Sequence, residues 1–125
     1  MPVLSTLAAR ISTALLLVFS NLFMTYAWYG HLRDQKDSPL WIAIGVSWGV
    51  AFFEYCLQVP ANRIGFQDAG FSLQQLKVMQ EIITMAVFAG FAAWYMKERI
   101  TLDFLWAALC LAAAAFFMFR GVKPA

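Results

Sequence analysis

Charged residues are scarce in this sequence. Of its 125 residues, 13% are charged and 62% are hydrophobic, whereas a soluble globular domain carries roughly 25% charged residues. This shortage excludes an ordinary soluble domain and indicates a membrane protein. The formal net charge of +2 is small, and the basic residues are spread over several segments, which excludes nucleic acid as a partner.

Cysteine and histidine are also rare, and this limits the available chemistry. Cys56 and Cys110 both fall inside apolar stretches, where we expect small apolar fillers and not a disulfide or a metal pair. His31 is the single histidine and has no second candidate ligand near it in the sequence. No serine–histidine–aspartate, cysteine–histidine or phosphate-loop pattern is present, so we expect no enzyme activity, no metal and no cofactor.

Long apolar stretches dominate the rest of the chain. Each of four stretches approaches the roughly 20 residues that a helix needs to cross a hydrocarbon core, and a backbone in lipid must satisfy its own hydrogen bonds, which favours helices over strands. We therefore predict an all-α integral membrane four-helix bundle in a single domain, residues 1–125. The second helix is expected to end near Pro60, because proline lacks an amide donor and disfavours continuation. The predicted helices are about 8–30, 39–59, 73–96 and 102–120.

Four spans place both termini on one side of the membrane, and the loops say little about which side that is. The terminal side has five Lys and Arg residues and the opposite side has four, so the positive-inside rule favours cytoplasmic termini by a margin of one and leaves dual topology open.

The tripeptide AWY occurs at 27–29 and 93–95, each time before a charged loop and a Leu-Trp pair. Two explanations fit this repeated pattern. The chain consists of two similar, duplicated hairpins, or Trp and Tyr occur there because they prefer the membrane interface.

Two carboxylates lie inside predicted spans. An acidic side chain there costs about 2.5 to 3.5 kcal/mol on insertion scales, and such residues tend to mark ion, proton or substrate pathways. We expect Glu54 and Glu81 at a similar depth on adjacent antiparallel helices, each on a polar stripe. For Glu54 we favour binding of a proton or a cationic substrate over a structural role satisfied by Arg63, Lys77 or an interfacial water. For Glu81, an ion pair with Lys77 explains the sequence equally well.

Neighbouring polar residues extend this predicted site. Gln58 and Asn62 follow Glu54 at helical spacing and are expected to add hydrogen bonds. Asn21 is nearer the middle of its span, where hydrogen bonding between helices is the expected use. The candidate residues for substrate or proton binding are Glu54, Glu81, Gln58, Lys77, Asn62, Arg63 and Asn21.

Small residues at helical spacing predict close packing of helices. Gly45 and Gly49 form a GxxxG pattern, and Gly90 lies among alanines on the third predicted helix; we expect both sets to pack within one protomer. The fourth predicted helix has small residues on several faces, including Ala108 and Ala112, which leaves room for a partner. Four helices can hardly enclose a substrate pathway, so transport would require a homo-oligomer, at least a dimer, in the lipid bilayer.

Three segments carry a family resemblance. Residues 91–119, FAAWYMKERITLDFLWAALCLAAAAFFMF, resemble the drug/metabolite transporter superfamily, in which an apolar helix ends in a Leu/Met-x-Glu-basic-aliphatic-Thr turn and a Gly/Ala-rich helix follows. FEYCLQVPANRIG at 53–65 and LQQLKVMQEIIT at 73–84 resemble a family of small four-helix bacterial inner-membrane proteins of unknown function within that superfamily. This resemblance implies transport across the inner membrane, with no established substrate.

The resemblance does not carry over a mechanism. The small multidrug resistance proteins, distant four-helix relatives, work as antiparallel dimers around an acidic residue in helix one. The first predicted helix here contains no acid, so an analogous role would have to move to Glu54 or Glu81, and likeness of fold alone does not settle function.

Two hypotheses follow from the sequence. The first is a small secondary transporter, a homo-oligomer that moves a cation or small metabolite with proton coupling through Glu54. The alternative is a structural or accessory subunit of a larger membrane protein complex.

Overall fold

Four long helices form the protein. The computed structural model describes residues 2–120, and this part of the chain contains no strand. Its elements are α1 (Pro2–Tyr29), the short α2 (His31–Asp34), α3 (Leu40–Gln67), α4 (Leu73–Gly90), the π-helical segment η1 (Phe91–Tyr95) that continues α4, and α5 (Leu102–Phe119). All four long helices are apolar and long enough to cross a membrane. The predicted all-α four-helix membrane architecture is therefore confirmed.

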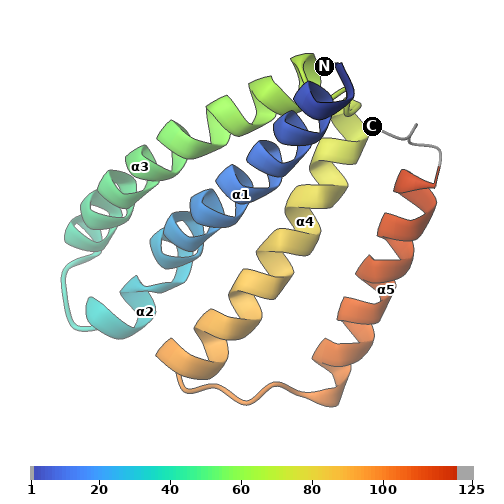
Figure 1. Ribbon diagram of the computed structural model, residues 1–125. Helices are drawn as coiled ribbons and strands as arrows, with labels where there is room; N and C mark the ends of the chain where they lie inside the picture. The colour runs from blue at the N-terminus through green and yellow to red at the C-terminus, as the bar shows by residue number, and fades with distance from the viewer. Residues whose placement is uncertain (1, 121–125) are drawn as a thin grey trace.

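The order of the helices in space differs from their order in the chain. The first helix, α1, lies between α3 and α4, and α5 lies on the far side of α4 (Figure 1). Both α1 and α5 have their terminal ends at the same end of the bundle, which we call the terminal side (Figure 1). Although α3 and α4 are consecutive, α1 separates them along most of their length and they meet near their connection.

One face of α1 makes most of the protein interior. Its buried side chains follow a spacing of three and four residues, which places them on one side of a helix. They are Ala9, Thr13, Leu17, Ser20, Asn21, Met24, Thr25 and Ala27. Half of them carry a hydroxyl or an amide group, so the interior of this membrane protein contains several polar side chains.

Close approach of three helices requires a glycine on α3. A Cβ atom built at Gly65 would lie 2.6 Å from Cδ2 of Leu76 on α4 and 2.9 Å from Cγ2 of Thr13 on α1. The neighbouring Ala61 is fully buried on the same face of α3. Small residues at this point let the backbones approach, as is usual for helix packing in lipid.

The second long helix does not end at Pro60, as the sequence suggested. α3 continues through Pro60 to Gln67, so the predicted boundary at residue 59 is wrong. Proline removes one backbone donor, and membrane helices tolerate this loss when neighbouring groups satisfy the freed carbonyl. Continuation is favoured because Glu54, Ala61 and Gly65 keep one face of α3 buried on both sides of the proline.

The expected packing of the other glycines within the protomer is also wrong. No atom of the described chain outside the helix's own backbone lies within 4 Å of a Cβ built at Gly45 or Gly49, and at Gly90 the neighbours are ring atoms of Trp94 at 3.9 Å. α3 packs through the face that holds Ala43 and Glu54, and a residue two positions from Ala43 is rotated by about 200° from it. The GxxxG pattern therefore points away from α1.

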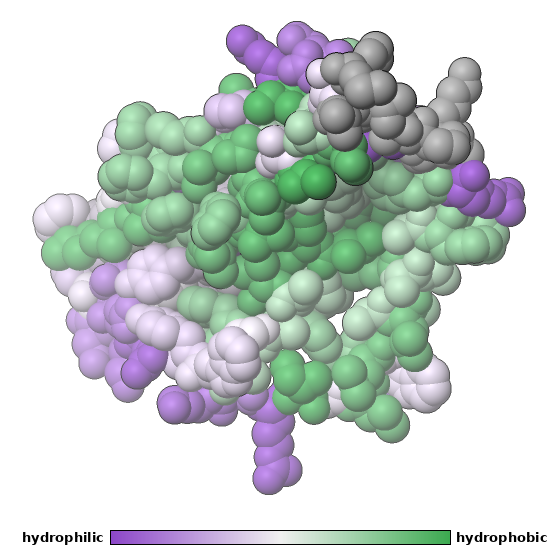
Figure 2. Space-filling model, in the orientation of Figure 1, coloured by the Kyte–Doolittle hydropathy of each residue, from purple (hydrophilic) through white to green (hydrophobic). Residues whose placement is uncertain are grey.

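The surface has a broad apolar band. In Figure 2 hydrophobic residues cover the middle of the visible face, and hydrophilic residues gather toward its two ends. Large side chains such as Trp48, Phe52 and Leu109 are exposed, as expected where lipid and not water is the solvent.

Two helix starts are capped: Ser72 forms a capping box with Gln75, and the Thr101 side chain accepts a hydrogen bond from the backbone of Phe104.

Candidate functional site

Glu54 is buried and has a neutral partner. It lies on the face of α3 that packs against α1, with 3% of its surface exposed. Ser20 Oγ on α1 donates a hydrogen bond of 3.0 Å to Glu54 Oε1. Within residues 2–120, no Lys, Arg or His nitrogen lies within 4.0 Å of this carboxylate. Glu54 is thus an acidic group in the membrane interior without a basic neighbour.

Glu81 is in a different situation. Lys77 Nζ lies 2.7 Å from Glu81 Oε1, and the two side chains are 71% and 47% exposed. They occupy positions i and i+4 of α4, a spacing that brings side chains together on a helix. The ion pair that the sequence offered as one explanation for Glu81 is therefore present.

The two carboxylates do not share a site. The helices α3 and α4 contact each other through Gln58 and Gln80, but α1 lies between them over most of their length (Figure 1). Glu54 hydrogen-bonds to α1, whereas Glu81 pairs within its own helix. The small side chains on the buried face of α1 allow it to fit there, and this could not be read from the stripes on the other two helices.

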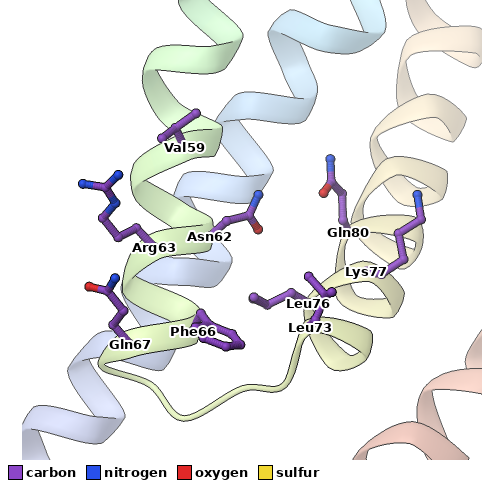
Figure 3. A pocket seen from close by; sticks show the side chains of 9 residues that line it. All are labelled: Val59, Asn62, Arg63, Phe66, Gln67, Leu73, Leu76, Lys77 and Gln80. Atoms are coloured by element: carbon purple, nitrogen blue, oxygen red, sulfur yellow. The ribbon is translucent and has the colours of Figure 1, made fainter.

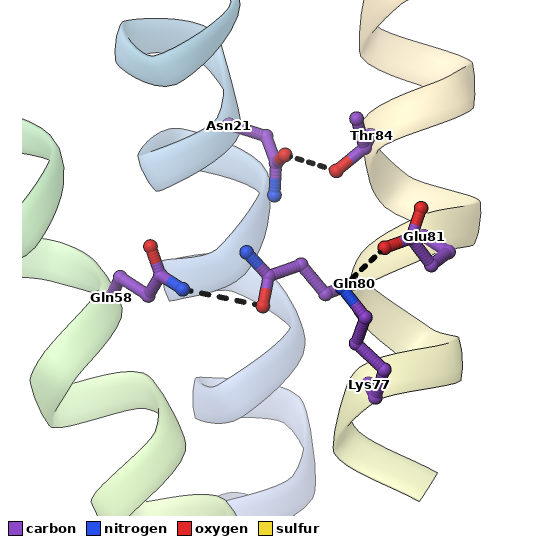
Figure 4. A network of polar contacts seen from close by, with 6 residues as sticks. All are labelled: Asn21, Gln58, Lys77, Gln80, Glu81 and Thr84. Atoms are coloured by element: carbon purple, nitrogen blue, oxygen red, sulfur yellow. Dashed lines mark hydrogen bonds and ion pairs between the residues drawn. The ribbon is translucent and has the colours of Figure 1, made fainter. Parts of the chain in front are cut away.

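Consecutive residues of α1 bond to opposite neighbours. While Ser20 bonds to α3, the fully buried Asn21 donates to the backbone carbonyl of Leu17 at 2.7 Å and accepts a hydrogen bond from Thr84 Oγ1 on α4 (Figure 4). Successive positions on a helix point about 100° apart, so one turn of α1 reaches both helices. The use of Asn21 in hydrogen bonding between helices agrees with the sequence prediction.

A second polar contact joins α3 to α4 directly. Gln58 Nε2 donates to Gln80 Oε1 at 3.3 Å (Figure 4). Neither Ser20 nor Gln80 was singled out in the sequence. The available signal was their helical spacing to other polar groups: Ser20 follows Thr13 by seven residues, and Gln80 precedes Thr84 by four.

The remaining predicted site residues lie in a groove at the terminal side. Asn62, Arg63 and Lys77 line a groove of about 450 Å³ between the end of α3 and the start of α4 (Figure 3). Glu54 is not among the lining residues of this groove. The structure therefore divides the predicted set between a buried carboxylate next to α1 and a basic groove near the connection.

Glu81 contributes to a separate cavity. This cavity of about 270 Å³ lies between α1, α4 and α5 and is lined by Thr25, Tyr29, Glu81, Thr84, Met85, Phe88, Phe104 and Leu111. A second, more apolar cavity of about 290 Å³ between α4 and α5 includes Ala108 and Ala112 in its lining. These two alanines leave space beside α4 and do not produce a tight helix contact.

A cluster at the opposite side was not anticipated. The Asp34 carboxylate accepts hydrogen bonds from the hydroxyls of Tyr26, at 2.6 Å, and Tyr95. Arg33 donates from Nη1 to the Tyr95 carbonyl at 2.8 Å, and its guanidinium carbon lies 4.4 Å from the centre of the Tyr95 ring. These contacts join α1 and α2 to η1. Tyr95 belongs to the second AWY tripeptide of the sequence, but the partner that it shares with Tyr26 was not predicted.

No metal-binding group is evident in the part of the chain that the structure describes. Among residues 2–120, no three His, Cys, Asp or Glu side chains are placed to hold one metal ion. Cys56 and Cys110 are free thiols on exposed positions of α3 and α5, so neither forms a disulfide in the described structure.

Taken together, four spanning helices around a polar interior define a small multi-pass membrane protein. The chain belongs to a family whose model, described as “Putative member of DMT superfamily (DUF486)”, matches residues 13–119. This finding confirms the resemblance seen in the sequence, and it indicates a transporter-type role. No curated protein and no solved structure shows significant similarity to the chain.

Proposed function

We propose that the protein is a proton-coupled secondary transporter of the bacterial inner membrane that moves a cation or a small cationic metabolite. The observation that supports this proposal best is the environment of Glu54: a carboxylate that is 3% exposed and accepts its hydrogen bond from a neutral hydroxyl. The proposal also includes a homodimer as the smallest assembly and cytoplasmic termini.

The Glu54 carboxylate lacks a compensating positive charge among the described residues. An ionised carboxylate offers about four lone-pair sites to donors, and Ser20 supplies one donor. A charged side chain in the membrane interior is costly unless a partner neutralises it, and no basic residue of the described chain is in reach of Glu54. Either a proton or a cation can neutralise the carboxylate. Competition between these two at one carboxylate is the simplest form of exchange.

Glu81 has a secondary role in this proposal. It already has Lys77 as its cation, so it does not require a proton or a substrate for neutrality. Its side chain nevertheless lines the cavity between α1, α4 and α5. A cationic substrate in that cavity would meet Glu81 together with the hydroxyls of Thr25 and Thr84, the latter already bonded to Asn21.

Transport assays in proteoliposomes test the proposal. Vesicles containing a trapped pH indicator are given an outward proton gradient, and organic cations from guanidinium to tetraphenylphosphonium are added outside as probes. The wild-type protein should exchange at least one probe for protons, and Glu54→Gln should abolish this exchange while the helical content is retained. Glu98→Gln, a change at an exposed acid in the loop before α5, is the matched control and should transport normally.

Two results would overturn the proposal. One is exchange by Glu54→Gln at the wild-type rate and with the wild-type pH dependence. The other is recovery of the protein, after gentle extraction and native mass measurement, in a fixed complex with other proteins in which Glu54→Gln is harmless. The second result would favour the alternative of an accessory subunit.

A further inference from the structure

The groove between α3 and α4 combines basic, amide and apolar side chains. It lies at the terminal side, beside the connection at residues 68–72, and has a volume of about 450 Å³. Its lining residues are Val59, Asn62, Arg63, Phe66, Gln67, Leu73, Leu76, Lys77 and Gln80 (Figure 3). It is distinct from the buried carboxylate proposed above for transport.

The apolar and polar groups occupy different parts of the groove. Phe66 from α3 and Leu76 from α4 point toward each other across the gap, and Asn62 also points from α3 toward α4 (Figure 3). Leu76 is 4% exposed and Phe66 is 58% exposed. The middle of the groove is therefore apolar, with Lys77 on its α4 side and Arg63 at the outer edge of α3, its side chain extending away from α4 (Figure 3).

The charge of the lining is positive. No Asp or Glu is among the lining residues, which include Arg63 and Lys77. Arg63 forms no ion pair within the described chain. Lys77 pairs with Glu81, but an ammonium group has three donors, so two remain for another ligand. Among the amides, Gln80 accepts from Gln58 with its oxygen, which leaves its NH₂ group available.

The depth of the groove suits a lipid headgroup. Gln67 ends α3 and Leu73 begins α4, so the mouth lies where two spans leave the hydrocarbon core. The same end of the bundle holds Arg10, which donates to the Ala69 carbonyl at 3.1 Å. Basic pockets between transmembrane helices are known binding sites for anionic headgroups, and each Lys or Arg near an anionic surface contributes about 1 kcal/mol.

We propose that this groove binds the phosphate group of an anionic phospholipid. Lys77 contacts the phosphate, with the amides of Asn62 and Gln80 as further hydrogen-bond donors, and the long side chain of Arg63 reaches it from the outer edge of α3. One acyl chain packs over Phe66 and Leu76 between α3 and α4. This proposal is independent of the transport function and does not require Glu54.

Binding of short-chain lipids in neutral detergent tests this assignment. The probes are dioctanoyl phosphatidylglycerol, dioctanoyl phosphatidylcholine and glycerol 3-phosphate, and the readouts are adducts in native mass spectra and the shift in thermal unfolding. We expect the first probe to bind most tightly. Removing both cations in Arg63→Gln/Lys77→Gln should weaken its binding by roughly 30-fold, which corresponds to about 1 kcal/mol for each cation.

Matched variants distinguish the effect of the two cations in the groove from a general effect of removing positive charge. Lys36→Gln/Arg99→Gln removes one lysine and one arginine from exposed positions on the opposite side of the bundle and should leave lipid binding unchanged. Because Lys77→Gln also breaks the pair with Glu81, Arg63→Gln alone is included; its side chain is exposed and in no ion pair of the described chain. It should weaken binding by roughly five-fold, the equivalent of about 1 kcal/mol.

Three outcomes would overturn the proposal. Equal binding of phosphatidylcholine and phosphatidylglycerol would show an apolar groove without anion selectivity. Unchanged phosphatidylglycerol binding by folded Arg63→Gln and by the double variant would place the lipid elsewhere. Binding of glycerol 3-phosphate as tight as that of phosphatidylglycerol would identify a soluble phosphate compound, and not a lipid, as the ligand.

Discussion

α1 and α5 are both apolar helices of membrane-crossing length, yet α1 is central in the protein and α5 is peripheral. Thr13, Ser20, Asn21 and Thr25 are among the buried residues of α1. α5 has no buried residue from Leu102 to Phe119, and its sequence contains no polar side chain after Asp103. The more apolar helix is therefore the more exposed one.

The difference between α1 and α5 shows which property of a helix favours its burial in a membrane protein. Lipid tails are as apolar as leucine, so burying a leucine brings no hydrophobic gain. Helices associate through close packing and hydrogen bonds between them instead. α1 provides small side chains and hydroxyl or amide groups on one face, and α5 provides mainly large apolar groups and alanines. Burial thus follows the groups that can form hydrogen bonds between helices, and not high hydropathy.

The largest expected effect compares one leucine on each helix. Leu17 on α1 is 0% exposed and Leu109 on α5 is 60% exposed. Leu17→Ala leaves a cavity in the packed interior and should lower the free energy of unfolding by about 2 to 5 kcal/mol, whereas Leu109→Ala should change it by less than about 0.5 kcal/mol. Unfolding of the dilute protein in mixed micelles measures both values. Equal losses would contradict the central position of α1.

The second prediction concerns the glycine where three helices meet. A Cβ at Gly65 would approach Thr13 Cγ2 to 2.9 Å, and a β-branched threonine has little freedom to move aside. Gly65→Ala should therefore lower the free energy of unfolding by about 1 to 3 kcal/mol. Gly49→Ala, on the same helix with no atom within 4 Å of the new carbon, is the control and should not destabilise. A stable Gly65→Ala variant would mean that α1 and α3 are farther apart.

The smallest expected effect is the coupling between α1 and α4. Asn21 accepts a hydrogen bond from Thr84, and measured hydrogen bonds between membrane helices average about 0.6 kcal/mol. A double-mutant cycle with Asn21→Leu and Thr84→Val should give a coupling energy of about that size. The same cycle with Asn21→Leu and Ile100→Val, in the loop before α5, should give none. Strict additivity in the first cycle would exclude the contact.

The sequence was sufficient to find the helices but not their neighbours. Four spans follow from the length of the apolar stretches, because a lipid environment permits few other backbone structures. The periodicity of polar residues indicates which face of a helix is turned inward, but it does not specify the helix that this face meets. For that reason the burial of Glu54 was compatible with the sequence, whereas its partner Ser20 and the insertion of α1 between α3 and α4 were not foreseen.

Two further features depend on contacts between distant residues. Pro60 favours a helix end when its local preference is considered alone, and the packing of Ala61 and Gly65 against the rest of the protein outweighs that preference. The cluster around Asp34 joins residues 61 positions apart in the chain, a separation at which no local pattern exists. In the same way, the sequence did not show that Arg63 and Lys77 line a groove to which Glu54 does not contribute.

The walls of the cavity beside Glu81 are held by different kinds of contact. Its α1 and α4 sides are joined by the hydrogen bond from Thr84 to Asn21, whereas its α5 side consists of Phe104 and Leu111 on a helix without buried residues. α5 is held at its last turn, where Gln75 Nε2 donates to the Met118 carbonyl at 3.3 Å. The wall that α5 forms is therefore held to α4 by this bond and by ring contacts, such as the stacking of Phe104 on Phe88, whereas the wall that α1 forms is held by polar side chains.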